Sequence, residues 1–243
     1  MKILLVNDDG YQDLGIITVR KVLEEYGDVY VSAPHDQKSG ASVSIGVHKG
    51  SNFTRIDEKT IACYGSPADC VYIGLYYYGT DFDLVVSGAN DGYNESYDSL
   101  FSGTVGAGIA ANLFGYKVLV LSADYHDTEE NIERKTRETM EFVLNNHLLD
   151  SFPFLSVNYP MKKYELGRGF KLGRIYNEPF VEKVIVNKEN KLQSKRQFDY
   201  SIFNEDSDRL LTANGYYSIT PLRASFEDTY NIDKFKKALD DIE

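Results

Sequence analysis

Short apolar runs and helical patterns alternate along the first half of the chain. The apolar runs are bounded by polar or glycine-containing segments, as buried parallel strands are, and they cover residues 3–6, 29–33, 84–87 and 118–121. Apolar residues recur at helical spacing in the segments that separate these runs, which are residues 15–26, 67–78 and 105–114. This alternation predicts an α/β fold with a doubly wound, mostly parallel sheet.

The pattern changes at two places. Residues 42–64 form short β-like pieces broken by glycine and Asp57, which predicts hairpins laid over the sheet. After an amphipathic helix at 129–149 and a strand at 155–157, residues 162–214 are richer in charge, with β-like runs at 181–186 and 197–202. We therefore expect three parts: a core over 1–160, an extended arm over 161–215, and a late strand and C-terminal helix over 216–243 that return to the core.

Composition and charge narrow the possible partners. The net charge of −11 disfavours a nucleic-acid duplex or an anionic membrane as the main partner, because both would repel this surface. Four apolar residues precede Asn7, too few for a signal-peptide core, and no apolar run approaches the roughly 20 residues of a membrane helix. These features predict a cytoplasmic protein. Cys63 and Cys70 are interpreted as buried core thiols.

Two adjacent acids follow the first predicted strand. Asp8 and Asp9 should emerge at the carboxyl edge of the sheet, where open α/β folds bind ligands. Their mutual repulsion is relieved by a hard divalent cation such as Mg²⁺ or Mn²⁺, which prefers oxygen ligands. On these two residues alone, the alternative that one acid caps the following helix stays open.

Other predicted strand ends carry matching chemistry. Ser39 lies in the loop after 29–33, and Asn90 and Asn94 lie in the glycine-containing loop after 84–87. Ser102-Gly103-Thr104 leads into the next helix, and backbone N–H groups at such a helix start bind anions. Metal ligands and a phosphate site are therefore expected at one edge of the sheet.

The same residues carry a resemblance to a known family. The chain resembles the SurE family, the stationary-phase survival proteins that act as 5′-nucleotidases. The similar motifs occur in order as Asn7-Asp8-Asp9-Gly10-Tyr11, Ser39-Gly40-Ala41-Ser42, Gly65-Ser66-Pro67-Ala68-Asp69-Cys70-Val71, Ser87-Gly88-Ala89-Asn90, Ser102-Gly103-Thr104-Val105-Gly106-Ala107 and Tyr217-Ser218-Ile219-Thr220-Pro221-Leu222. The chain departs from the family pattern at Ser96, where a glycine is usual, near 110–112, and at 204–209, which only loosely follow a Gly-Thr-Asp-Phe pattern.

The resemblance implies a site and an assembly. It implies that one divalent metal ion per subunit, Mg²⁺ or Mn²⁺, is held by four residues, Asp8, Asp9, Ser39 and Asn90. It places four residues around the phosphate, Asn94, Ser102, Gly103 and Thr104, and it makes Asp8, Asp9 and Asn94 the catalytic residues. A Rossmann-like core with a C-terminal arm exchanged between subunits is also implied, as a homodimer or homotetramer.

The expected reaction is hydrolysis of nucleoside 5′-monophosphates by metal-activated water. Asp8 and Asp9 are equal candidates for the general base, and action on 3′-monophosphates or polyphosphate stays open. A receiver domain also begins with paired acids, but it needs a phosphate-accepting aspartate at a later strand end, and Asp57 lies in a charged turn. A non-catalytic nucleotide-binding protein is the second alternative, which an assay for phosphate release from AMP would exclude.

Two aromatic features receive a structural interpretation. His35, in the Ser39 loop, has no paired histidine at metal spacing and is interpreted as a loop residue. The run Tyr76-Tyr77-Tyr78 could stack on a nucleobase, but packing of a helix end on the sheet is favoured.

Overall fold

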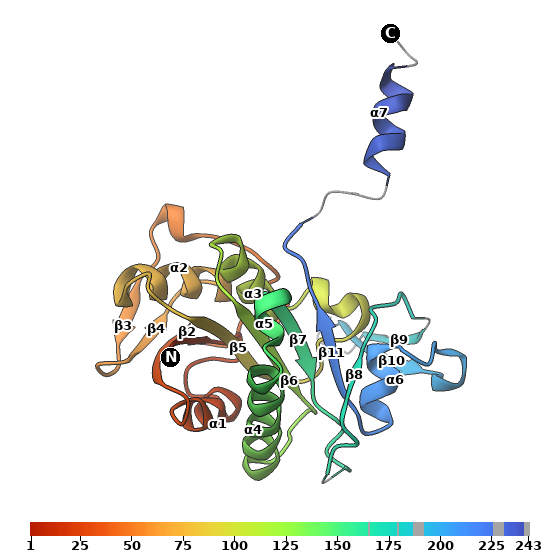
Figure 1. The fold of residues 1–243 in the computed structure, drawn as a ribbon, viewed down its shortest axis with the longest axis horizontal. Helices are drawn as coiled ribbons and strands as arrows, with labels where there is room; N and C mark the ends of the chain where they lie inside the picture. The colour runs from red at the N-terminus through yellow and green to blue at the C-terminus, as the bar shows by residue number, and fades with distance from the viewer. Residues whose placement is uncertain (165, 179, 187–191, 226–230, 241–243) are drawn as a thin grey trace.

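The computed structural model describes residues 1–164, 166–178, 180–186, 192–225 and 231–240. Within these ranges the main sheet has nine strands in the order β3-β4-β2-β1-β5-β6-β7-β11-β8 (Figure 1). The strands are β1 (Lys2–Val6), β2 (Asp28–Pro34), β3 (Phe53–Arg55), β4 (Thr60–Cys63), β5 (Leu84–Asp91), β6 (Val118–Ala123), β7 (Phe154–Asn158), β8 (Phe170–Leu172) and β11 (Tyr217–Pro221).

Strand direction confirms the predicted fold class. The six neighbouring strands from β4 to β7 are all parallel to one another. β3 at one edge and β11 near the other pair antiparallel with their neighbours β4 and β7. The fold is thus a doubly wound, mostly parallel α/β sheet with antiparallel additions at its edges.

Helices cover both faces of the sheet. α1 (Leu14–Leu23) and α4 (Glu129–Asn145) pack on one face, while α2 (Pro67–Tyr78) and α3 (Gly103–Leu113) pack on the other. Successive residues of β1 divide between these two cores, since Ile3 and Leu5 join the first and Leu4 and Val6 join the second. Because both faces of the central strands are buried, their sequences are unbroken apolar runs.

Helix starts lie at the carboxyl edge of the parallel strands. Asp13 caps α1 by accepting from the N–H of Gly15, and Ser66 and Asp69 form a capping box at α2. Gly15 is required by packing, because a Cβ there would lie 2.1 Å from the carbonyl oxygen of Ala89 at the end of β5. α1 can therefore begin directly against the strand that carries Asn90.

The C-terminal region adds elements beside the main sheet. β8 and β11 join the main sheet, whereas β9 (Phe180–Val186) and β10 (Leu192–Phe198) form a separate antiparallel pair. Between β10 and β11 lie a 3-10 turn, η3 (Tyr200–Ile202), and a short helix, α6 (Asp208–Ala213). None of the helices in the described ranges has the length and hydropathy that crossing a membrane requires.

The last helix corrects one expectation. We expected the C-terminal helix to return to the core, but every residue of α7 (Ile232–Asp240) is exposed, and Figure 1 shows the helix apart from the sheet. Its apolar side chains, Ile232, Phe235 and Leu239, lie at helical spacing. An amphipathic pattern predicts the helix but not the surface that it covers.

Three further expectations need correction. The hairpin β3-β4 does not lie over the sheet, since β4 extends it by pairing parallel with β2. The helix expected over 129–149 ends at Asn145, and a left-handed residue, His147, separates it from α5 (Leu148–Ser151). Tyr76 and Tyr77 are exposed rather than buried in the core. The structure also has 3-10 turns η1 (Val47–Lys49) and η2 (Ser96–Leu100).

Candidate active site

The ends of β1 and β5 and the start of α3 bring three predicted site residues together. The hydroxyl of Thr104 forms a short hydrogen bond with Oδ1 of Asp8 and lies 3.0 Å from Oδ1 of Asn90. A hydroxyl carries one proton, so it donates to one of these oxygens at a time and its lone pairs face the other. Residues far apart in sequence thus form one cluster of oxygen atoms at the carboxyl edge.

Asp8 is the buried centre of this cluster. The residue is 2% exposed, and burial raises the pKa of the carboxyl to about 6, helped by the charge of Asp9 and opposed by the Thr104 hydrogen bond. Gly103 makes the packing possible, because a Cβ there would lie 2.8 Å from Oδ2 of Asp8. The start of α3 therefore lies directly against the Asp8 carboxylate.

Asp9 points to the rim of the same edge. It is half-buried and accepts from the backbone N–H of Asp91 at 2.9 Å and from Nε2 of Gln37 at 3.2 Å. The backbone N–H of Lys38 donates to the carbonyl of Asp8 at 2.7 Å. Ser39, the next residue, is exposed on this loop, so the backbone carries it to the edge without a described side-chain contact to either acid.

Asn94 and Ser102 have partners inside the fold. The Asn94 amide donates to Oγ of Ser122 at 2.9 Å, and its backbone is held on both sides by the Asn158 side chain. Oγ of Ser102 caps α3 by accepting from the N–H of Val105 at 3.0 Å. The Ser102 hydroxyl keeps its own proton available, whereas the Asn94 side chain fixes the loop beyond Asn90.

The donor set at this edge fits a hard divalent cation. Asp8 and Asp9 supply carboxylates and Asn90 supplies an amide oxygen, which are ligands that Mg²⁺ and Mn²⁺ prefer. Within the ranges that the structure describes, neither acid forms an ion pair with Lys, Arg or His, and no group of three or more His, Cys, Asp or Glu could hold a metal. A cation here would rely on two carboxylates and neutral oxygen donors.

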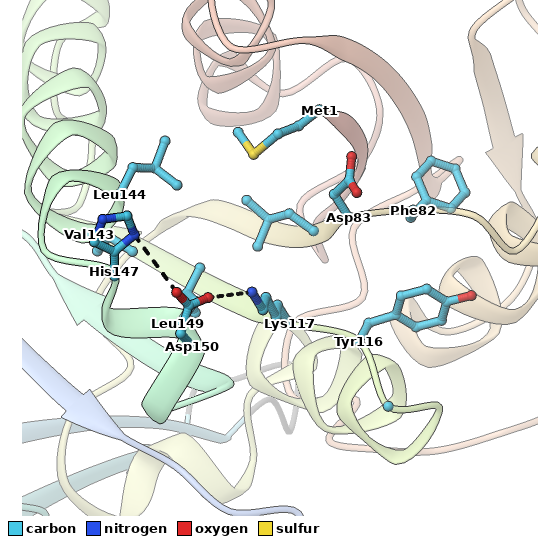
Figure 2. Close-up of a pocket in the computed structure, with 12 residues that line it drawn as sticks. Met1, Phe82, Asp83, Tyr116, Lys117, Val143, Leu144, His147, Leu149 and Asp150 are labelled. Carbon is cyan, nitrogen blue, oxygen red and sulfur yellow. Dashed lines mark hydrogen bonds and ion pairs between the residues drawn. The ribbon is translucent and has the colours of Figure 1, made fainter.

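Two cavities lie at different distances from the oxygen cluster of Asp8, Asn90 and Thr104. One of about 110 Å³ adjoins Asn90 and is also lined by Asp13, Asp91 and Asp127. Another of about 680 Å³ lies at the opposite edge, where Met1 precedes β1 and Lys117 precedes β6 (Figure 2).

Charged side chains of the larger cavity are paired with one another. Asp150 contacts Nζ of Lys117 at 2.6 Å and Nδ1 of His147 at 3.8 Å (Figure 2). The size of this cavity therefore does not mark the candidate site, which lies at the opposite edge with the two acids after β1.

A second group of buried acids was not predicted from the sequence. We call Glu95, Glu178, Asp208 and Arg209 the junction cluster, because it joins the loop after β5 to α6 and the segment before β9. Nε of Arg209 lies 3.3 Å from Glu178, and Nη1 lies 3.7 Å from Glu95. Burial raises the pKa of Glu95 to about 8 and that of Asp208 to about 6.

The junction cluster holds a loop of the candidate site. The N–H of Ser96 donates to Asp208 at 2.8 Å and its hydroxyl donates to Glu178 at 2.6 Å. This loop connects Asn94 to Ser102. Only Asp208 and Arg209 have a sequence signal, the loose match of 204–209 to a family pattern. No periodicity relates Glu178 to Glu95.

Comparison with known proteins adds a family to this geometry. The family described as "Survival protein SurE" matches residues 3–182. The "5'-nucleotidase SurE" of Clostridium beijerinckii is 31% identical over 240 residues, covering 94% of this chain and 95% of that protein. The "5'/3'-nucleotidase SurE" of Wigglesworthia glossinidia brevipalpis is 31% identical, covering 96% of this chain and 95% of that protein.

A solved structure is similar along nearly the whole chain. The SurE protein from Aquifex aeolicus matches with a TM-score of 0.85 and 28% identity, covering 98% of this chain and 100% of that one. The likeness therefore includes the C-terminal region as well as the parallel sheet.

Proposed function

The chain belongs to the SurE family, and on that premise we propose that it is a 5′-nucleotidase that hydrolyses nucleoside 5′-monophosphates. The observation that carries the proposal is the oxygen cluster of Asp8, Asn90 and Thr104 at the carboxyl edge of the sheet. Such an edge is where open α/β folds bind and transform ligands.

We propose that Asp8, Asp9, Asn90 and Ser39 hold one Mg²⁺ or Mn²⁺ ion. When bound, such a cation offsets phosphate charge and lowers the pKa of water, which supplies the nucleophile. The protein's own part is to orient the ligands. Thr104 fixes the Asp8 carboxylate, while Asp91 and Gln37 fix that of Asp9.

The start of α3 is the proposed phosphate site. Backbone N–H groups at Gly103 and Thr104 begin an eleven-residue helix, and its dipole favours an anion at this end. Ser102 can donate its hydroxyl proton to a phosphate oxygen while it accepts from Val105. Asn94 holds the loop between β5 and α3 in place through its hydrogen bonds with Ser122 and Asn158.

A substrate and metal panel tests this proposal. We expect phosphate release from 5′-AMP in the presence of Mg²⁺ or Mn²⁺, reversible loss with chelator, and recovery when metal is returned. The panel includes 3′-AMP and polyphosphate to define the substrate range. The 3′-nucleotide is included because the Wigglesworthia relative is named a 5′/3′-nucleotidase. Binding of AMP without turnover under any metal would contradict the proposal and favour a non-catalytic nucleotide-binding protein.

The mechanism is a choice between water and an aspartyl-phosphate. We propose water as the nucleophile, with Asp8 or Asp9 accepting its proton, because oxygens committed to ligand contacts are poor nucleophiles. Quenching during turnover followed by borohydride reduction converts any phosphoaspartate to homoserine. Stoichiometric homoserine at position 8 or 9 would overturn the water mechanism.

We also propose that the chain assembles as a homodimer or homotetramer through its C-terminal region. The strand β9 exposes Val184, Ile185 and Val186, and α7 exposes Phe235 and Leu239. Exposed apolar side chains grouped on elements outside the core favour association. Sedimentation should give a dimer or larger, and a monomer at micromolar concentration would contradict the proposal.

A further inference from the structure

Three aromatic side chains form a row beside the candidate site. We call Tyr11, His35 and Tyr64 the aromatic row. The rings of His35 and Tyr64 are stacked, with centroids 4.9 Å apart and planes 19° from parallel. The Tyr11 ring is tilted against that of His35, with the two centroids 5.9 Å apart.

The row follows the carboxyl ends of three neighbouring strands. His35 and Tyr64 come directly after β2 and β4, and Tyr11 follows the Asp8-Asp9 turn after β1. Backbone hydrogen bonds fix this order, since Tyr11 donates to Pro34 at 3.0 Å and His35 donates to Cys63 at 2.7 Å. Two strand steps span about 10 Å, so the row extends sideways from the acids by about that distance.

The outer part of the row is accessible and fixed in orientation. The Tyr64 residue is 53% exposed and the His35 side chain is 39% exposed. The Tyr64 hydroxyl lies 3.3 Å from that of Thr54, and Nδ1 of His35 lies 3.1 Å from Asp36. A flat aromatic surface held in one orientation loses little conformational entropy when another ring stacks on it.

The exposed tyrosines of α2 lie at the opposite edge of the sheet. Tyr76 and Tyr77 are near the end of α2, where the carbonyl of Tyr78 accepts from Nζ of Lys2 at the start of β1. A ligand whose phosphate lies at Asp8 is at the far end of β1. These tyrosines therefore cannot take part in binding the same molecule.

We propose that Tyr64, whose ring is supported by the stacked ring of His35, stacks the nucleobase of the substrate while its phosphate lies at the start of α3. This inference rests on the proposed nucleotidase function. Base stacking on an aromatic side chain tolerates every base, because each has a π-face. The site should therefore accept purines and pyrimidines, and it should favour nucleotides over phosphate esters that lack a base.

The test compares a substrate with a base and one without. For Tyr64→Ala and His35→Ala we expect kcat/KM for 5′-AMP and 5′-CMP to fall about tenfold to a hundredfold, mainly through KM. Turnover of ribose 5-phosphate should be unchanged in both variants. Tyr64→Phe, which keeps the ring, should retain wild-type selectivity, and Tyr76→Ala is the matched exposed tyrosine that should change neither substrate.

The two proposals fail in different ways. An equal loss on 5′-AMP and ribose 5-phosphate would mean that Tyr64 only supports the loop, and it would overturn the stacking site while the nucleotidase function stands. Unchanged kcat/KM for 5′-AMP in both alanine variants would overturn the stacking site as well. A wild-type enzyme that hydrolyses neither substrate with any divalent metal would overturn the nucleotidase function, and the stacking site with it.

Discussion

Two groups of buried acids in this protein are stabilised in different ways. At the carboxyl edge, Asp8 is surrounded by a hydroxyl, a glycine and a second acid. In the junction cluster, the largely buried guanidinium of Arg209 pairs with the buried carboxylates of Glu95 and Glu178 and with the half-buried Asp98. Both regions carry raised carboxyl pKa values because of burial, but only the junction cluster contains its own cation.

This difference suits the carboxyl edge to binding a ligand and the junction cluster to stabilising the fold. A buried charge with no internal partner is costly, and an external cation that compensates it gains affinity from the same environment. A buried cluster with an internal arginine has ion pairs and hydrogen bonds within the fold, so it does not depend on a ligand for them. The comparison predicts that changes at the edge affect activity and that changes at the junction affect stability.

The largest effect is expected for Asp8→Asn. Removing a charged oxygen from the proposed metal site should lower kcat/KM for 5′-AMP by at least about 10³-fold. Stability should not fall, because the neutral amide is easier to bury than the carboxylate. Steady-state kinetics and thermal unfolding of the same preparation test both points. A variant that loses its fold together with its activity would place Asp8 with the structural acids.

Arg209→Met should give the opposite result. Removing the guanidinium leaves the buried carboxylates of Glu95 and Glu178 without their cation, and we expect a loss of about 3–5 kcal/mol in the free energy of unfolding. Arg137→Met is the matched control, since Arg137 contacts Glu25 and Glu133 at the surface. The control should cost less than about 1 kcal/mol. Equal losses in the two variants would show that burial of the junction does not matter.

The junction should also make stability depend on pH. The pKa of Glu95 is raised to about 8 from an ordinary value of 4.5, so the folded state binds more protons between these values. Stability is therefore lost as pH rises through this window. Between pH 6 and 8, Glu95 should lower the free energy of unfolding of the wild type by roughly 2 kcal/mol, and Glu95→Gln should lack this decrease. Urea unfolding at several pH values measures the slope, and an unchanged slope in the variant would contradict the assignment.

Thr104→Val gives the smallest expected change and refines the description of the edge. Because the hydroxyl contacts Asp8 and Asn90, its loss should weaken metal binding and raise the half-saturating metal concentration about tenfold. Thr104→Ser keeps the hydroxyl and should stay close to the wild type. If metal dependence is unchanged while kcat/KM falls about 10²- to 10³-fold, the hydroxyl acts on the phosphate instead.

The sequence by itself determined the elements and the chemistry of the edge. Apolar runs such as 118–121 and the helical spacing of 67–78 depend on neighbours a few positions away, so a periodic pattern reveals them. The adjacency of Asp8 and Asp9 after a strand likewise follows from local order. These signals were sufficient for the fold class and for the family resemblance.

Tertiary structure decided which distant residues meet. Ser96 reaches Glu178 and Asp208 across 82 and 112 positions, and no local period relates them. Pairing of β4 with β2, the stacking of Tyr64 on His35 and the exposure of α7 are likewise set by the path of the chain. Hydrophobic periodicity fixes which face of an element is buried, whereas the partner of that face depends on how all the elements pack together.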